Sequence, residues 1–272
     1  GGKILWTKKL KNPILGKVKE VDLLRNGKKQ LAFTTKNNFY ILDRTGRAVA
    51  PFPKKFRDDI TQALSIFDYD NNRKYRFVIT QGKDVLMLDS QGKKVKGFKF
   101  EKSTSNIVFP PQHFRINRKD YITIAEESGK LNILSRVGKP RVTVSKAFDF
   151  SNTPIILENT KLVIINKDNS KNSVGLDGKT VTNKLEVTSY HFTVKGKTKV
   201  TLDDNLMRIN GVLIELPFGI YTAPTISIVN RKIYISITET QENKVYVYNK
   251  SGSLLSGFPV YATSIIDLGD LT

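Results

Sequence analysis

An acidic loop near residue 70 carries the side chains best suited to metal chemistry. Asp68, Asp70 and Asn72 place three oxygen-bearing groups at alternate positions, and calcium binds about six to eight such oxygen ligands in one site. Arg73 and Lys74 follow, however, where a calcium loop would supply glycine and a further acid. We therefore predict an Asx-rich tight turn. Calcium at Asp68, Asp70 and Asn72 is the alternative, and we expect no other metal or cofactor.

Reactive groups of the kinds that enzymes use are few. The chain has no cysteine and two histidines, His113 and His191, neither of which has a second histidine two or four residues away. His113 lies in Pro110–Phe114, which we interpret as a connection between repeats. The nucleophile elbow G-x-S-x-G and the glycine-rich phosphate and dinucleotide loops do not occur. The sequence thus predicts no catalytic residue. A lyase or glycan hydrolase with a site at a central funnel is kept as an alternative.

Basic residues outnumber acidic ones, and most of the excess lies in the first half of the chain. The chain has 45 Lys and Arg against 25 Asp and Glu, a net charge of +20, and up to Arg136 it has 29 basic and 13 acidic residues. A field of this strength attracts polyanions. We predict a basic sector that binds anions, with a solvated lysine surface as the alternative. The candidate residues, paired near expected turns, are Lys28, Lys29, Lys54, Lys55, Arg73, Lys74, Lys93 and Lys94.

The elements that position these residues form a repeat. Short runs of β-branched and aromatic residues, separated by Asp, Asn and Gly, predict strands joined by tight turns, as at 64–67, 75–79, 85–88 and 94–95. The motif Asp43-x-x-Gly46 returns as Asp89-x-x-Gly92, and Gly138 follows after the same spacing of 46 residues. Four strands in a repeat of about 40 to 50 residues are typical of a β-propeller blade.

We therefore predict an all-β fold, a single β-propeller domain over residues 1–272 with six or seven four-stranded blades. A split closing blade is expected from residues 1–10 with 261–272, because strands from both ends would close the ring and remove its exposed edges. A two-sheet sandwich is the alternative, which the even period disfavours. The expected blade units are 12–55, 62–100, 110–145, 152–184, 188–218 and 222–260.

Two motifs resemble known propeller repeats. The Asp-x-x-Gly turn after the third strand, with Gly257-Phe258-Pro259 after a fourth, resembles repeats of the quinoprotein-like group. The loop at residues 68–78 resembles the FG-GAP type of repeat, whose acidic loop binds calcium. Together the units are similar to the C-terminal propeller of large, uncharacterised bacterial cell-envelope proteins. This resemblance implies an extracytoplasmic, periplasmic or envelope-associated location, and it implies a fold rather than an activity.

The overall composition is that of a folded soluble domain. Hydrophobic residues make up 39% and charged residues 26% of the chain, and no apolar run approaches the roughly 18 residues of a membrane span. Because the chain opens on Gly1 without methionine, we interpret it as a mature or excised piece. We predict a non-catalytic recognition or scaffold module whose partner is a protein or an anionic envelope component. Nucleic-acid binding is the alternative.

Overall fold

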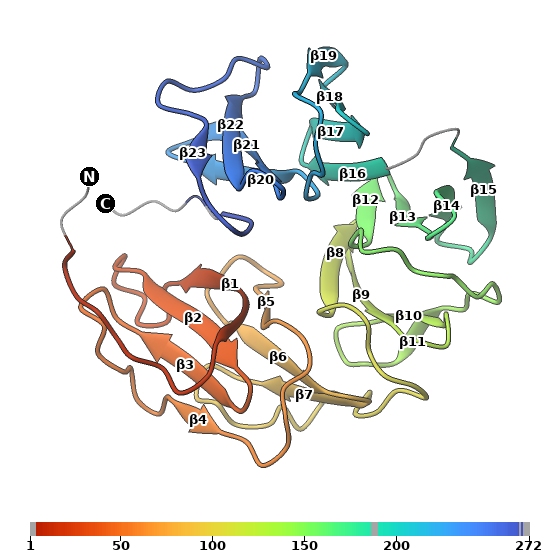
Figure 1. Cartoon of the computed structure of the whole chain (residues 1–272). Coiled ribbons are helices and arrows are strands. Elements are labelled where there is room, and N and C mark those ends of the chain that lie inside the picture. The colour runs from red at the N-terminus through yellow and green to blue at the C-terminus, as the bar shows by residue number, and fades with distance from the viewer. Residues whose placement is uncertain (1–3, 186–189, 267, 269–272) are drawn as a thin grey trace. The chain divides into compact units, whose positions relative to one another are not determined.

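Strands and the loops between them make up the structure. The computed structural model describes residues 4–185, 190–266 and 268, and within these ranges it contains no helix. No helix that could cross a membrane is therefore present in the described part. The strands form six antiparallel sheets, which we call blades 1 to 6 in chain order (Figure 1). The chain divides into two compact units, Gly1–Phe148 and Asp149–Thr272, each containing three blades.

The first unit contains blades 1 to 3, and in each the strands pair in chain order. Blade 1 consists of β1 (Ile14–Val21), β2 (Gln30–Thr35), β3 (Asn38–Leu42) and β4 (Lys54–Lys55). Blade 2 consists of β5 (Ser65–Phe67), β6 (Arg76–Gln81) and β7 (Asp84–Leu88). Blade 3 consists of β8 (Gln112–Ile116), β9 (Lys119–Ala125), β10 (Leu131–Leu134) and β11 (Pro140–Val142).

The second unit contains three four-stranded blades with the same sequential pairing. Blade 4 consists of β12 (Ile156–Glu158), β13 (Lys161–Ile165), β14 (Ser170–Val174) and β15 (Thr180–Lys184). Blade 5 consists of β16 (Tyr190–Lys195), β17 (Thr198–Asp203), β18 (Leu206–Ile209) and β19 (Val212–Glu215). Blade 6 consists of β20 (Thr225–Val229), β21 (Lys232–Glu239), β22 (Lys244–Asn249) and β23 (Val260–Tyr261).

Blades 1 and 2 share an apolar core built from alternating strand positions. Phe39 and Ile41 lie two residues apart on β3, as do Phe77 and Ile79 on β6, so each pair faces one side of its sheet. All four side chains are at most 1% exposed. The rings of Phe39 and Phe77 have centroids 4.9 Å apart, which joins the two blades directly.

A second repeating contact, between an aromatic ring and a turn glycine, joins the blades of the first unit. An aromatic ring at the end of one repeat packs against the glycine of the Asp-x-x-Gly or Ser-x-x-Gly turn in the next blade, and both partners recur every 46 residues. A Cβ added to these glycines would lie 2.7, 3.4 and 3.0 Å from the respective ring, and each glycine has a positive φ. On blade 1 the ring comes from the segment before β1. The pairs are Trp6 with Gly46, Phe52 with Gly92 and Phe98 with Gly138.

The structure corrects the prediction at two places. Residues 94–95, expected as the fourth strand of blade 2, form only an isolated bridge between Leu88 and Lys94, and the chain then turns Phe98 into the core. His113, expected in a connection, lies in β8, which pairs with β9. The turn between these strands is Asn117-Arg118, both with positive φ. It lacks the glycine that usually marks such a turn in a sequence.

The two ends of the chain do not test the predicted closing blade. Residues 4–10 carry no strand, and β23 ends at Tyr261. Residues 1–3, 267 and 269–272 lie outside the described residues, and the ends belong to different compact units. The pairing of residues 1–10 with 261–272 therefore stays a prediction, as do the predicted blade limits and the single domain.

Candidate functional site

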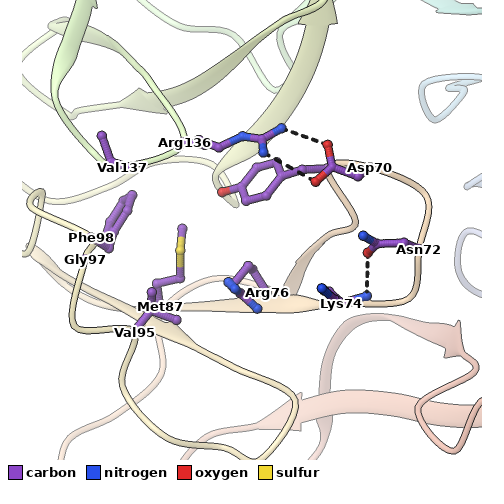
Figure 2. A pocket seen from close by; sticks show the side chains of 11 residues that line it. Asp70, Asn72, Lys74, Arg76, Met87, Val95, Gly97, Phe98, Arg136 and Val137 are labelled. Carbon is purple, nitrogen blue, oxygen red and sulfur yellow. Dashed lines mark hydrogen bonds and ion pairs between the residues drawn. The ribbon is translucent and has the colours of Figure 1, made fainter.

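A pocket of about 210 Å³ lies beside blade 2 in the first unit. Its walls come from the β5–β6 loop, the strands β6 and β7, the segment after β7 and the β10–β11 turn. Figure 2 shows the apolar side chains at one end and Asp70, Asn72 and Lys74 at the other, with Arg76 between them. The lining residues are Tyr69, Asp70, Asn72, Lys74, Arg76, Met87, Val95, Gly97, Phe98, Arg136 and Val137.

The β5–β6 loop is held by its own polar side chains. The Asp68 carboxylate accepts hydrogen bonds from the backbone N–H groups of Asn72 at 3.0 Å and Arg73 at 2.9 Å. The Asn72 side-chain oxygen in turn accepts the Lys74 N–H at 3.1 Å. These are the contacts of an Asx-type turn. They fix the position of Lys74 at the rim of the pocket.

The same loop recurs 46 residues earlier in blade 1. The Asp22 carboxylate accepts the N–H groups of Asn26 and Gly27, each at 3.1 Å, and the Asn26 side chain accepts the Lys28 N–H at 3.0 Å. The turn around Asn26 therefore keeps its acid in Asp22.

In both loops the oxygens that a calcium ion would need accept protein N–H groups. Asp68 and Asn72 accept backbone N–H groups, and Asp70 accepts hydrogen bonds from Arg136 at 3.0 Å and Arg115 at 3.4 Å. A calcium site requires several such oxygens to converge on one cation. This donor set therefore fits a turn that contacts arginine better than it fits calcium.

A buried carboxylate positions Arg136 over the pocket. The Asp120 side chain is only 6% exposed. One of its oxygens accepts a hydrogen bond from Arg136 Nε at 2.7 Å, and the other contacts His113 Nε2 at 2.9 Å. The Arg136 guanidinium also donates a hydrogen bond to Asp70, and it lies 4.9 Å from the centre of the Tyr69 ring. Blade 3 thereby fastens its β10–β11 turn to the β5–β6 loop of blade 2, and Figure 2 shows the resulting Arg136–Asp70 contact.

Burial and charge act on this network in opposite directions. Burial raises the pKa of the Asp120 carboxyl, but the hydrogen bonds from His113 and Arg136 outweigh it, and the net pKa is lowered. Burial lowers the pKa of His113, which the Asp120 contact opposes only in part. His113 is thus neutral at pH 7, and with its proton on Nε2 the ring donates to Asp120.

Two cations at the pocket have no carboxylate partner among the described residues. Lys74 forms no ion pair there, and Arg76 donates only to the Tyr75 carbonyl, at 3.1 Å. By strand register, the position of Arg76 is occupied by Gln30 one repeat earlier and by Tyr121 one repeat later, which are 1% and 5% exposed. The Gln30 side-chain oxygen accepts a hydrogen bond from the Leu23 N–H at 2.7 Å and so stabilises the β1–β2 loop of its own blade. The repeat therefore has no structural need for a cation at this position.

Sequence reasoning identified Asp70, Asn72 and Lys74 but missed Arg76 and Arg136. The signal was present: aligning the repeats at their 46-residue period shows arginine at position 76 where the flanking repeats have uncharged residues. Arg136 is harder to find, because Arg44 occupies the same place two repeats earlier and is exposed. Only the packing of blade 3 on blade 2 distinguishes the two arginines.

The remaining predicted anion-binding residues are spread over blades 1 and 2, where Lys54 and Lys55 form strand β4 and the others lie in loops. Three of them form ion pairs: Lys29 with Glu20 at 2.7 Å, Arg73 with Asp22 at 3.0 Å and Lys94 with Glu101 at 2.9 Å. The Arg73–Asp22 pair links the equivalent loops of blades 2 and 1. The others, all exposed, are Lys28, Lys54, Lys55 and Lys93.

The two compact units differ strongly in charge. The first unit carries 32 basic and 13 acidic residues, a net of +19, whereas the second carries 13 and 12, a net of +1. Nearly all of the excess positive charge thus belongs to the unit that contains the pocket.

The second unit has a cavity of about 310 Å³ lined by polar side chains. His191 lies in its wall on β16, and its Nδ1 is buried without a hydrogen-bond partner in the described part of the chain. Burial lowers the pKa of His191, so this ring is also neutral at pH 7. Lys167, the cation in this wall, is paired with Asp149 at 2.6 Å. This cavity therefore lacks the unbalanced charge of the blade 2 pocket.

Comparison with known proteins shows the fold. No family model and no curated protein matches the sequence. Among solved structures, BBS1N in complex with ARL6DN is similar over 92% of this chain and 84% of its own, with 14% identity and a TM-score of 0.63. BamB from Moraxella catarrhalis is similar over 95% and 80%, with 15% identity and a TM-score of 0.57. The AfRom2 CNH domain is similar over 90% and 84%, with 12% identity and a TM-score of 0.57. These neighbours are β-propellers, so the prediction is confirmed: the six all-β blades of this chain are those of a β-propeller.

Proposed function

We propose that this β-propeller is a non-catalytic recognition or scaffold module that binds an anionic partner through its first unit. One observation carries the proposal: the pocket of blade 2 gathers Lys74, Arg76 and Arg136 against Asp70, the one carboxylate among its described lining residues, within a unit of net charge +19. Such a field attracts acidic surfaces and speeds their association.

Two buried carboxylates, Glu126 and Glu239, hold loops in place, and their lowered pKa values disfavour them as general acids. Glu126, fully buried, accepts the N–H groups of Thr104 and Ser105 at 2.9 and 2.8 Å. Glu239, 3% exposed, accepts the N–H groups of Ile220 at 3.1 Å and Gln241 at 2.9 Å. In both cases these hydrogen bonds lower the carboxyl pKa although burial opposes them. A general acid in a glycan hydrolase requires a raised pKa instead.

A salt titration with three polyanions tests the proposal. The intact chain is titrated with poly-glutamate, with a short DNA duplex and with vesicles that contain phosphatidylglycerol, each across a salt series. We expect poly-glutamate to bind, with an affinity that falls as salt rises. Absence of binding to all three polyanions at low salt would overturn the proposal. Tighter binding of DNA with a steep salt slope would favour the nucleic-acid alternative.

We further propose that the module belongs to a larger bacterial envelope protein, as the resemblance of its units to the C-terminal propeller of large, uncharacterised bacterial cell-envelope proteins implies. Fractionation of cells that produce the natural protein tests this location. Recovery in the periplasmic or membrane fraction is expected, and recovery in the cytosol alone would contradict it.

A further inference from the structure

We propose that the blade 2 pocket binds an acidic side chain of a partner protein, with an apolar neighbour of that side chain seated at the apolar end of the pocket. The inference rests on the proposed function and specifies the ligand chemistry at the same site.

The first argument is the charge left over after internal pairing. Among the described residues, Asp70 is the one acidic residue that lines the pocket, and Arg136 and Arg115 both contact its carboxylate. Arg136 is also bound to buried Asp120. Lys74 and Arg76 therefore have no carboxylate partner among the described residues. An incoming anion would form ion pairs with both. Arginine favours planar carboxylates, which it can bind through two parallel hydrogen bonds.

The second argument comes from the repeat itself. In blade 1 the positions of Arg76 and Tyr69 carry Gln30 and Leu23, and the Gln30 side chain accepts a hydrogen bond from the Leu23 N–H. Blade 1 thus folds the same loop without a guanidinium. Arg76 is a departure from the repeat at a pocket, which indicates a role in binding rather than in folding.

The third argument is the division of the pocket into a charged and an apolar end. Figure 2 shows Met87, Val95, Phe98 and Val137 gathered opposite the polar residues. A nucleic-acid backbone brings phosphates but no apolar side group to that end. A peptide that carries an acidic and an apolar residue side by side supplies both. A volume of about 210 Å³ suits a side-chain-sized group rather than a whole cofactor.

A pair of fluorescent hexapeptides tests the inference on the intact chain. One alternates Glu and Leu, and the other replaces every Glu by Gln; binding is followed by fluorescence anisotropy at low salt. We expect the Glu peptide to bind at least about tenfold more tightly than the Gln peptide. R76Q, which installs the residue found in blade 1, and K74A should each weaken the Glu peptide by about tenfold.

Matched controls separate a local site from the general positive field. R44Q removes one positive charge in the same way from an exposed loop of the same unit, and K130A does so at another exposed position. Both should leave peptide affinity within about twofold of the parent chain. Circular dichroism and thermal unfolding of each variant verify that it is folded.

The outcomes distinguish this inference from the proposed function. If poly-glutamate and the Glu peptide bind but R76Q and K74A have no more effect than R44Q and K130A, the pocket is not the site, and the proposed function stands. If neither ligand binds the parent chain, both fail. If the Glu and Gln peptides bind equally, or if the DNA duplex or the phosphatidylglycerol vesicles show a stronger dependence on Arg76 than the Glu peptide does, the assignment to an acidic peptide is overturned.

Discussion

The indole ring of Trp6 lies against Gly46, so closely that a Cβ on this glycine would stand 2.7 Å from the ring. The indole N–H also donates to the Arg44 carbonyl at 2.8 Å. The segment before β1 is thus fastened to the β3–β4 turn of blade 1. The same contact between an aromatic ring and a glycine recurs on blades 2 and 3, where the ring belongs to the preceding blade.

Replacing this glycine tests the contact against a matched control. Gly46 and Gly27 have similar positive φ values of 80° and 76°, but nothing lies within 4 Å of a Cβ at Gly27. We expect Gly27→Ala to cost about 1 kcal/mol from the left-handed backbone alone, and Gly46→Ala to cost about 1 to 3 kcal/mol more because it displaces the Trp6 ring. Urea unfolding measures both. Equal losses would show that the indole does not pack as described.

The rings themselves should differ in their contribution to stability. Phe52 is 5% exposed and its ring lies 4.8 Å from that of Phe39, whereas Trp6 is only half-buried. Phe52→Ala should therefore destabilise the protein by about 3 to 5 kcal/mol, and Trp6→Ala by roughly half as much because less surface is buried. Chemical unfolding followed by tyrosine fluorescence reports both. A larger loss for Trp6 than for Phe52 would contradict this order.

The free energy of unfolding should decrease as the pH is lowered and the histidines become protonated. Burial lowers the pKa of His113 below 6.5 in the folded state, so its contribution is fully present above pH 6.5 and is lost as the pH falls through the folded pKa. Because His191 shifts in the same direction, His113→Gln should remove only part of the pH dependence, at most about 1.4 kcal/mol per pH unit. Urea unfolding between pH 7.5 and 4.5 measures the slope. An unchanged slope in the variant would contradict a buried, neutral His113.

Calcium should have little effect on thermal stability. The oxygens of Asp68 and Asn72 already accept protein N–H groups, so we expect about 1 mM calcium to shift the unfolding midpoint by less than about 1 °C. A site filled at about 100 times its dissociation constant would instead add about 2.7 kcal/mol. Calorimetry with calcium and with excess chelator decides between these results, and magnesium serves as the control for ionic strength.

The sequence by itself determined the strands, the turns and the repeat, because these follow from local chemistry. Alternating apolar residues specify strand faces, and the glycines at 46, 92 and 138 mark turns that need positive φ. A period of 46 residues then requires units that pack on one another. The β-propeller prediction depended on these signals alone. The strand β8 escaped detection because its turn, Asn117-Arg118, reaches positive φ without glycine.

Tertiary structure alone decided which charges meet. Arg136 and Asp70 are 66 residues apart in the chain, and nothing local to either predicts the other. Arg44 has the same place in its repeat as Arg136 and stays exposed. Arg136 differs because buried Asp120 holds it over the blade 2 pocket. Electrostatic contacts depend on distance and burial, and both are set by how blade 3 packs on blade 2, which a one-dimensional pattern does not contain.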